Sequence, residues 1–490
     1  MNNKYSLLTV ALLALISFNL IAQEHQLTLL DVIDLAKENS TAAKSAVTRK
    51  ENRYWQYRTY RANYNPSLNL NGNLPGYSRL YKGIEQNDGT TNYTDIQQVS
   101  STLNLGLKQD IALTGGSISV NSSLNQFGNL IGDGFEDQYR TTLINVRLEQ
   151  PIFGFNELKW NKRIEPLKYE ESKRSFVEDM ERVSQEATTH YFNYLDAQIS
   201  LQIATFNQAI NDSNYRIQKG RFNIGTVTKD DLLQFELQKL SSERAVIQAN
   251  LDLQIARLQL RSYIGITEGS ELKMELIAPG ELPEFDIPLE KALEFARANR
   301  SDFLQYERRR IEAQRDVSRA QSQRFETNLN ASFGYNQAAN NLPEAYVDPN
   351  GEQVVNVSLR MPILDWGRSK SRIETAKANQ QLTEYTLDQE IQNFEQEIIS
   401  LVGRFEVYRA NVEISRRTDE VAQERYDVTQ NRYLGGKATV TDLTLAQGQK
   451  DEAKRGYLNA LRQFWNSYFE LRRLTLYDFL NDELLYTEND

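Results

Sequence analysis

Hydrophobic residues recur at helical spacing along most of the chain. This spacing predicts a helical segment over 29–62, beginning near Thr28 or Asp31, and two very long helices over about 158–219 and about 370–431. At 1.5 Å per residue, a helix of about 60 residues spans roughly 90 Å. Isolated helices gain little stability from propensity alone, so we expect these helices to pack side by side along their length.

Shorter stretches between the helices alternate polar and apolar residues, which predicts strands. One face of each strand is then apolar, and the other carries small polar side chains. This pattern fits an outer-membrane barrel with a wet lumen, and a soluble sandwich gives the same alternation. The expected strands include the runs 67–74, 101–107, 117–121 and 327–335, and two runs that end at Pro151 and Pro362, because proline is tolerated at strand ends.

The helix that follows each long helix carries mostly apolar residues in steps of three and four. In the first such helix these positions form two neighbouring stripes. One heptad stripe packs against one partner helix. Two stripes therefore predict a helix with a neighbour on each side, as in a cylinder of helices. A wide core face in a helical bundle gives the same pattern. The first stripe is Leu232, Phe235, Lys239, Ser242, Val246, Ala249, Leu253, Ala256, Leu260 and Tyr263, and the second is Leu233, Leu237, Leu240, Arg244, Ile247, Leu251, Gln254 and Leu258. The later helix repeats the first stripe as Leu443, Ala446, Lys450, Ala453, Tyr457, Ala460, Phe464, Ser467 and Leu471.

The chain contains two copies of one plan. Residues 145–153 match residues 356–364 at an offset of 211 positions. The same offset, with no gap, aligns the Arg-Phe-Asn-Ile-Gly run at 221–225 with the Arg-Tyr-Leu-Gly-Gly run at 432–436. An insertion inside a long helix would rotate its buried face, so an unbroken register suits two pairs of long helices.

The front parts of the two copies match at a different offset. Residues 34–39 match residues 294–299, which lie 260 positions later. The two offsets differ by 49, so the first copy holds that many additional residues between its two matching parts. We expect an inserted hairpin at about 80–130, which gives six strands per chain in place of four. Neither number closes a sizeable barrel, so several chains must share one.

The first 22 residues read as a secretory signal peptide. Lys4 supplies the positive end, the stretch 7–16 is almost purely apolar, and Ala22 is a plausible cleavage point. The rival interpretation is a membrane anchor, but the apolar core is short for a helix that must span a bilayer. The expected division of the chain is a signal peptide at 1–22, a first repeat at 23–285, a second repeat at 286–476 and a tail at 477–490.

Composition narrows the classes of function. The chain carries 66 acidic and 56 basic residues, which argues against a nucleic-acid partner. It has no cysteine and two histidines, His25 and His190, far apart and outside any recognisable motif. This excludes cysteine-based chemistry and leaves no catalytic or metal-binding constellation. We therefore expect no enzyme activity, no cofactor and no metal.

Two in-register copies of strand, long helix, tip motif and returning helix resemble the TolC-like outer-membrane efflux proteins, also called outer membrane factors. The resemblance implies an α+β homotrimer, with barrel strands in the outer membrane of a Gram-negative bacterium and coiled-coil helices that form a periplasmic α-barrel. It implies an exit duct of a tripartite efflux or type I secretion system, with a periplasmic adaptor and an inner-membrane pump as partners. The alternative is an exported coiled-coil structural or adhesion protein without channel activity.

The tips of the helix pairs, about 219–231 and about 430–442, are the expected functional site. Glycines supply a flexible backbone there, and threonines can cap the returning helices. By resemblance, aspartates line the aperture and form acidic rings about a threefold axis; an acid in a first turn otherwise merely complements the helix dipole. The expected aperture residues are Asp231, Asp442 and Asp230, and the expected tip-turn and adaptor-contact residues are Arg221, Phe222, Gly225, Thr228, Arg432, Tyr433, Gly436 and Thr439.

Overall fold

Both repeats contribute to each compact unit of the chain. The computed structural model describes residues 25–131, 134–266, 274–280 and 282–487. The signal peptide expected at 1–22 lies outside the described residues. One unit comprises Met1–Glu51, Ser172–Ser301 and Ile391–Asp490, and the other comprises Asn52–Glu171 and Asp302–Glu390.

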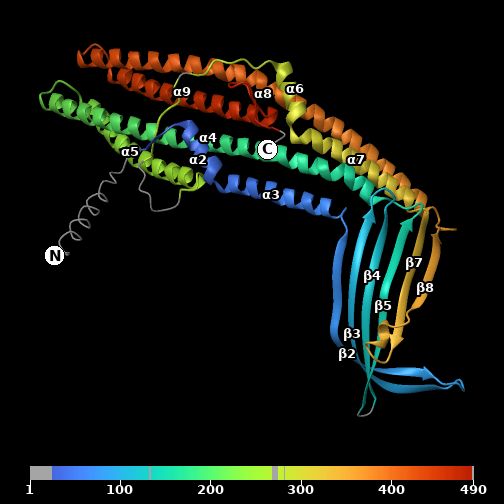
Figure 1. Ribbon diagram of the computed structural model, residues 1–490. Helices are drawn as coiled ribbons and strands as arrows, with labels where there is room; N and C mark the ends of the chain where they lie inside the picture. Colours follow the sequence, from blue (N-terminus) through green and yellow to red (C-terminus); the bar gives the residue numbers. More distant parts are fainter. Residues whose placement is uncertain (1–24, 132–133, 267–273, 281, 488–490) are drawn as a thin grey trace, which may run out of the picture. The chain divides into compact units, whose positions relative to one another are not determined.

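The α-helices of the described residues fall into two matching sets of four (Figure 1). In the second set α6 and α7 begin 260 residues after α2 and α3, whereas α8 and α9 begin 211 residues after α4 and α5. These are the two offsets found in the sequence. The sets are α2 (Leu29–Asn39), α3 (Thr41–Ala62), α4 (Glu157–Asn223) and α5 (Lys229–Tyr263), then α6 (Leu289–Asn299), α7 (Ser301–Ser322), α8 (Arg368–Leu434) and α9 (Val440–Thr475).

The first helical segment begins where the sequence predicts but is interrupted once. Thr28 caps α2 in a capping box with Asp31, so the predicted start is confirmed. The helical segment expected over 29–62 is interrupted at Ser40, whose backbone is extended and ends α2. The Ser40 hydroxyl then accepts a hydrogen bond from the Ala43 N–H at 3.0 Å, which starts α3. Serine favours such caps because its side chain competes for backbone groups.

Six antiparallel strands form one sheet in the unit that contains residues 52–171. Consecutive strands are neighbours throughout, so β2 and β8 are the two edges. The expected six strands are confirmed in this sheet, and β3 and β4 fall where the inserted hairpin was expected. In sheet order the strands are β2 (Ser67–Glu85), β3 (Thr91–Ile111), β4 (Gly116–Ile131), β5 (Gly134–Pro151), β7 (Glu326–Ala339) and β8 (Asn350–Arg360).

The strand register gives this sheet two chemically different faces. Leu70 lies opposite Leu105, and Val120 lies opposite Val146, on one face. On the other face, asparagine, serine and glycine follow one another across the strands. The apolar face includes Leu68, Leu70, Leu105, Leu107, Ile118, Val120, Val146, Leu148, Phe333, Val355 and Val357, and the polar face includes Asn69, Asn71, Asn104, Gly106, Ser119, Asn121, Asn145, Asn330, Ser332 and Asn356.

Two small strand pairs and one 3₁₀ turn complete the described elements. They are the parallel pair β1 (His25–Leu27) and β6 (Met274–Leu276), the antiparallel pair β9 (Tyr477–Asp478) and β10 (Glu483–Leu484), and η1 (Glu344–Tyr346). In the described part of the chain, no helix combines the length and the apolar character needed to cross a membrane. Long helices together with a separate antiparallel sheet make the fold α+β, as the sequence predicts.

Candidate functional site

Each helix pair turns at a glycine with positive φ. Gly225 has φ 77°, a region that L residues with a Cβ rarely adopt. The N–H of Thr226 donates to the carbonyl of Arg221 at 3.0 Å, which closes the end of α4 as in a Schellman motif. The turn over 432–437 repeats this arrangement, with Gly436 at φ 70°. Both glycines therefore lie at turn positions where a residue without a Cβ is favoured.

The returning helices begin with two equivalent capping boxes. Asp231 Oδ2 accepts hydrogen bonds from the Thr228 hydroxyl at 2.7 Å and from its N–H at 3.1 Å. Asp442 Oδ2 accepts from the Thr439 hydroxyl at 2.7 Å and from its N–H at 2.9 Å. In return, each aspartate N–H donates to the threonine hydroxyl. The tip aspartates therefore help to start their helices, whatever further role they have.

Those hydrogen bonds keep the tip carboxylates ionised. The Thr228 hydroxyl and N–H lower the pKa of Asp231 below its ordinary value. The Thr439 hydroxyl and N–H lower the pKa of Asp442 in the same way, and the positive charges of Arg432 and Arg425 lower it further. Asp442 is exposed and Asp231 is half-buried, so both charges reach the surface of the tip. Asp230 is also exposed in the first turn of α5.

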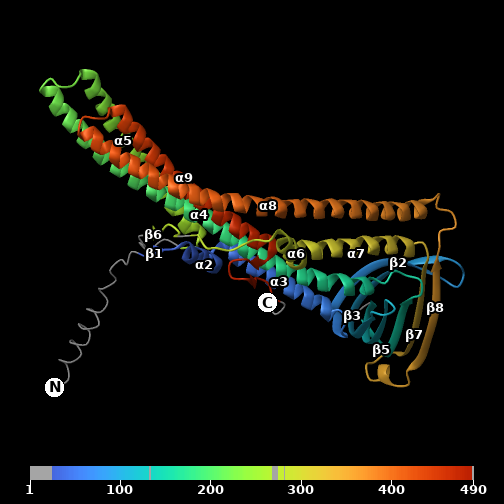
Figure 2. The same cartoon turned by 90° about the horizontal axis from the view of Figure 1, so that it is seen from above.

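A small hydrophobic cluster joins the two tips. Its buried members are Phe235, Tyr426, Tyr433, Leu443 and Ala446, and the half-buried Tyr215, Ala438 and Val440 pack against it. Because it draws on α5, α8 and α9, it holds the two helix pairs together near their turns. The two turns belong to the unit that comprises Met1–Glu51, Ser172–Ser301 and Ile391–Asp490. Figure 1 and Figure 2 both show the α4–α5 turn and the α8–α9 turn at the same end of this unit.

The aromatic residues of the two tip motifs lie differently. Tyr433 is 6% exposed, and its hydroxyl accepts a hydrogen bond from the Gln218 side chain of α4. The equivalent Phe222 is 37% exposed. Tyr433 therefore bonds inward across the two helix pairs, whereas Phe222 offers its ring to the surface. Arg432 is exposed, and its guanidinium donates to the carbonyl of Lys437 at 3.4 Å.

The four long helices α4, α5, α8 and α9 lie side by side in the order α5, α4, α9, α8 (Figure 1). Near the turns, the hydrophobic cluster also brings α5 into contact with α8 and α9. Polar side chains bridge each neighbouring pair, so α5 and α8 form the two edges (Figure 1). The bridges include Lys239 with Asp212 at 2.9 Å (α5 to α4), Thr189 with Asn466 at 3.3 Å (α4 to α9), and Lys454 with Asp419 at 3.0 Å (α9 to α8).

Both edge helices expose apolar residues at coiled-coil spacing. On α5 the first sequence stripe is largely covered within the chain, since Phe235, Ser242, Ala249, Ala256 and Leu260 are buried. The second stripe is uncovered. Its apolar members Leu233, Leu237, Leu240, Ile247, Leu251 and Leu258 are 47–73% exposed. On α8 the exposed residues Val407, Ile414, Val421 and Val428 follow one another at intervals of seven.

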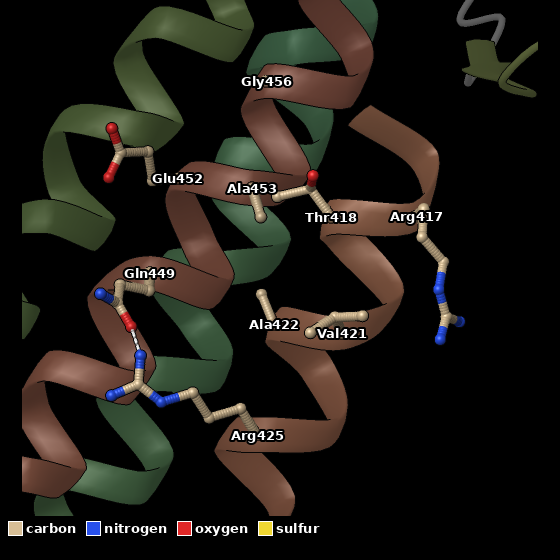
Figure 3. A pocket seen from close by; sticks show the side chains of 9 residues that line it. All are labelled: Arg417, Thr418, Val421, Ala422, Arg425, Gln449, Glu452, Ala453 and Gly456. Carbon is tan, nitrogen blue, oxygen red and sulfur yellow. Dashed lines mark hydrogen bonds between the residues drawn. The ribbon is translucent and has the colours of Figure 1, made fainter. Parts of the chain in front are cut away.

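A groove of about 600 Å³ runs between α8 and α9 beside the exposed stripe of α8. Figure 3 shows Val421, Ala422 and Ala453 between the two helices, with the Arg425 guanidinium bonded to the Gln449 side chain. The small residues Ala422, Ala453 and Gly456 leave this space between the two helices. Its remaining lining residues are Arg417, Thr418 and Glu452.

The chain matches a known family over most of its length. The family is described as outer membrane efflux protein, and the match covers residues 32–266 and 292–475. The chain belongs to the outer membrane efflux protein family. No curated protein matches this sequence at a significant level.

Solved structures of outer-membrane channels and of an outer-membrane protein share this fold at low sequence identity. The Campylobacter jejuni CmeC outer membrane channel is 16% identical, with 91% of this chain and 85% of that chain covered and a TM-score of 0.66. The outer membrane protein VceC of Vibrio cholerae is 16% identical over 91% and 95%, with a TM-score of 0.62. The open state of the Neisseria gonorrhoeae MtrE outer membrane channel is 19% identical over 91% and 88%, with a TM-score of 0.60.

Outer membrane efflux proteins are channels and not enzymes. Within the described residues, no group of three histidines or carboxylates is arranged to hold a metal ion. The sequence pattern did not predict the hydrogen bond from Gln218 to Tyr433, or that Phe235 and Leu443 meet in one cluster. The helical stripes contain both Phe235 and Leu443, so a signal for the cluster existed. No pattern around Gln218 singles it out.

Proposed function

We propose that this chain is the exit duct of a tripartite efflux or type I secretion system. In this role it passes substrates from a periplasmic adaptor and an inner-membrane pump through the outer membrane of a Gram-negative bacterium. The observation that carries the proposal is that the sheet and the layer of long helices each have two edges that no described element of the chain covers. The sheet has the free edge strands β2 and β8, and the helical layer has the uncovered apolar stripes of α5 and α8.

Neighbouring copies of the chain would pair with the edge strands of the sheet and cover the apolar stripes of the edge helices at the same time. An edge strand presents unpaired N–H and C=O groups, and an exposed heptad stripe presents apolar surface to water. Six strands are too few for a wide barrel, and three chains supply 18, a number typical of barrels with an aqueous channel. The same three chains would place α5 of one chain beside α8 of the next. We therefore propose a homotrimer, in line with the family.

The two faces of the sheet suit this assembly. In a closed barrel, the face with Leu70, Leu105 and Val146 would contact the lipid of the outer membrane. The face with Asn71, Asn104 and the other small polar residues would line the lumen. A soluble sandwich would require a second layer over the apolar face. Among the described residues, the apolar side chains Leu68, Leu70, Val355 and Val357 are instead exposed.

The paired tips are the proposed aperture of the duct. Three copies of Asp231 and Asp442 would form acidic rings, with Asp230 adding charge in the first repeat only. The lowered pKa values of Asp231 and Asp442 keep these two carboxylates charged at neutral pH, which favours cations at the aperture. Arg221, Phe222 and Arg432 are the proposed contacts for the adaptor, since their side chains are exposed or half-buried beside the turns.

Fractionation of cells that express the full chain tests this proposal. The duct must be found in the outer-membrane fraction and must run as a trimer in mild detergent. An exported coiled-coil protein without channel activity would instead be released with the periplasmic or secreted fraction. Recovery of a folded monomer from the soluble fraction would overturn the proposed function.

A further inference from the structure

Lys450 occupies a core position on α9. It belongs to the stripe that includes Leu443 and Ala446, both of which are buried, and it is itself 9% exposed. Lysine is almost never buried unless its charge is paired. At a core position of a coiled coil, a single lysine costs stability and specifies how the helices pair. The contacts of its ammonium group therefore indicate what the position does.

The ammonium group lies between aromatic rings from the two helix pairs. Its Nζ is 4.5 Å from the ring centre of Phe206 on α4 and 4.6 Å from that of Tyr426 on α8. It also lies 3.5 Å from Asp451 Oδ1, and the Asn207 side chain of α4 donates to Asp451 Oδ2. Two cation–π contacts and an ion pair thus offset the cost of burying the charge. Together they link the α4–α5 pair to the α8–α9 pair.

The equivalent lysine of the first repeat makes no such link in the described contacts. Lys239 lies 211 residues before Lys450, and Tyr215 lies 211 residues before Tyr426. The Lys239 Nζ is 5.4 Å from the Tyr215 ring and 2.9 Å from Asp212, both on α4. The lysine–tyrosine pair is therefore common to both repeats, and the crossing to the other helix pair belongs to Lys450.

The contact around Lys450 is incompletely satisfied. Tyr426 Oη and Asn207 Oδ1 are buried and form no hydrogen bond with any described residue. Buried polar atoms without partners cost free energy, and they regain hydrogen bonds when water reaches them. Separating the helix pairs here therefore costs less than separating an apolar contact of the same size. The arrangement holds the pairs together and remains easy to open.

We propose that Lys450 is a releasable clamp between the two helix pairs of one chain. The inference rests on the proposed function, because separation of the helix pairs at the tips is the movement that widens an aperture there. Lys450 keeps the pairs together through Phe206, and its polar surroundings let them part without exposing an apolar core. An apolar residue of similar length at this position locks the junction instead.

Thiol labelling measures the opening directly, since the chain has no cysteine. Ala446, 1% exposed in the tip cluster, is replaced with Cys as the only thiol, and its reaction with a maleimide is followed in the intact full-chain protein. We expect Lys450→Met, made together with Asp451→Asn so that no carboxylate loses its partner, to slow labelling by roughly tenfold relative to Asp451→Asn alone. Lys450→Ala in the same background should speed labelling, because Met fills the site and Ala leaves a gap. Lys239→Met, the matched control, should label like the parent.

A second variant keeps the test independent of any one substitution. Phe206→Leu removes the ring contributed by the other helix pair, so it should speed labelling when Lys450 is present and have little effect beside Lys450→Met. Labelling of the protein with Lys450→Met and Asp451→Asn that matches or exceeds the rate of Asp451→Asn alone overturns the clamp. If labelling responds as expected and the protein forms no pore, the clamp stands and the proposed function fails.

Discussion

Arg472 of α9 donates a hydrogen bond from Nη1 to Asp478 Oδ2 at 2.6 Å. The same guanidinium donates from Nε to Glu181 Oε2 on α4 at 2.8 Å. Asp478 is fully buried and Glu181 is 3% exposed, and Lys37 of α2 lies 3.1 Å from Glu181. Arg472 therefore links the segment after α9 both to α9 itself, in the second repeat, and to α4, in the first repeat.

Removal of Arg472 should be strongly destabilising. In Arg472→Leu, two buried carboxylates lose their main partner, and breaking such a network costs about 3–5 kcal/mol. Denaturant unfolding followed by circular dichroism measures the effect. Arg416→Leu is the control, since Arg416 pairs with Glu413 and Glu420 on the exposed face of α8. Equal unfolding midpoints for the two variants would show that the buried network contributes nothing.

Acid should weaken the same network through Asp478. Burial opposes ionisation of this carboxyl, but the Tyr468 hydroxyl and Arg472 outweigh it and lower its pKa below the ordinary 3.8. A lowered folded pKa means that the stabilisation is fully present above pH 3.8 and is lost as the pH falls through the lower value. Asp478→Asn should therefore melt with a shallower pH dependence below pH 3.8 than the parent. If the melting temperatures of the variant and the parent change equally with pH over the whole range, Asp478 is not the group through which acid weakens the network.

The exposed stripe of α5 should control assembly. Ile247 is 73% exposed and sits in the middle of that stripe. A carboxylate there would be buried without a partner in the trimer, so Ile247→Asp should yield folded monomers. Light scattering in detergent gives the mass, and circular dichroism checks the helices. Gln259→Glu, an exposed position outside the stripe, should remain trimeric; a trimeric Ile247→Asp would place the interface elsewhere.

The caps and the charges of the tip can be separated. Thr228→Ala with Thr439→Ala removes the hydroxyl from each capping box, which typically costs about 1 kcal/mol per helix start. Amide exchange in the first turns of α5 and α9 should become faster, while Asp231 and Asp442 keep their charges. We expect cation preference to persist in this variant. Its loss would mean that the capping geometry, and not the charge alone, sets the preference.

Long-range patterns in the sequence predicted much of the architecture. Helical spacing of hydrophobic residues predicted the long helices, because periodic burial repeats over many residues. The 49-residue difference between the two repeat offsets, together with the strand alternation, predicted the six strands. The break at Ser40 was missed because one serine does not disturb the helical pattern around it. The inward position of Tyr433 depends on Gln218, which is more than 200 residues away in the chain. Lys450 was recognised as part of a stripe, but only the structure brings Phe206 to it.

Single-channel recording from the purified full chain in a planar bilayer shows directly whether the chain forms a pore. We expect discrete conductance steps with a preference for cations. We expect a weaker preference in Asp231→Asn with Asp442→Asn, which keeps an oxygen at each cap and removes the charge. If the wild type conducts and the variant behaves identically, the aspartates serve only to start their helices. A correctly folded trimer that forms no pore would contradict the proposed exit duct.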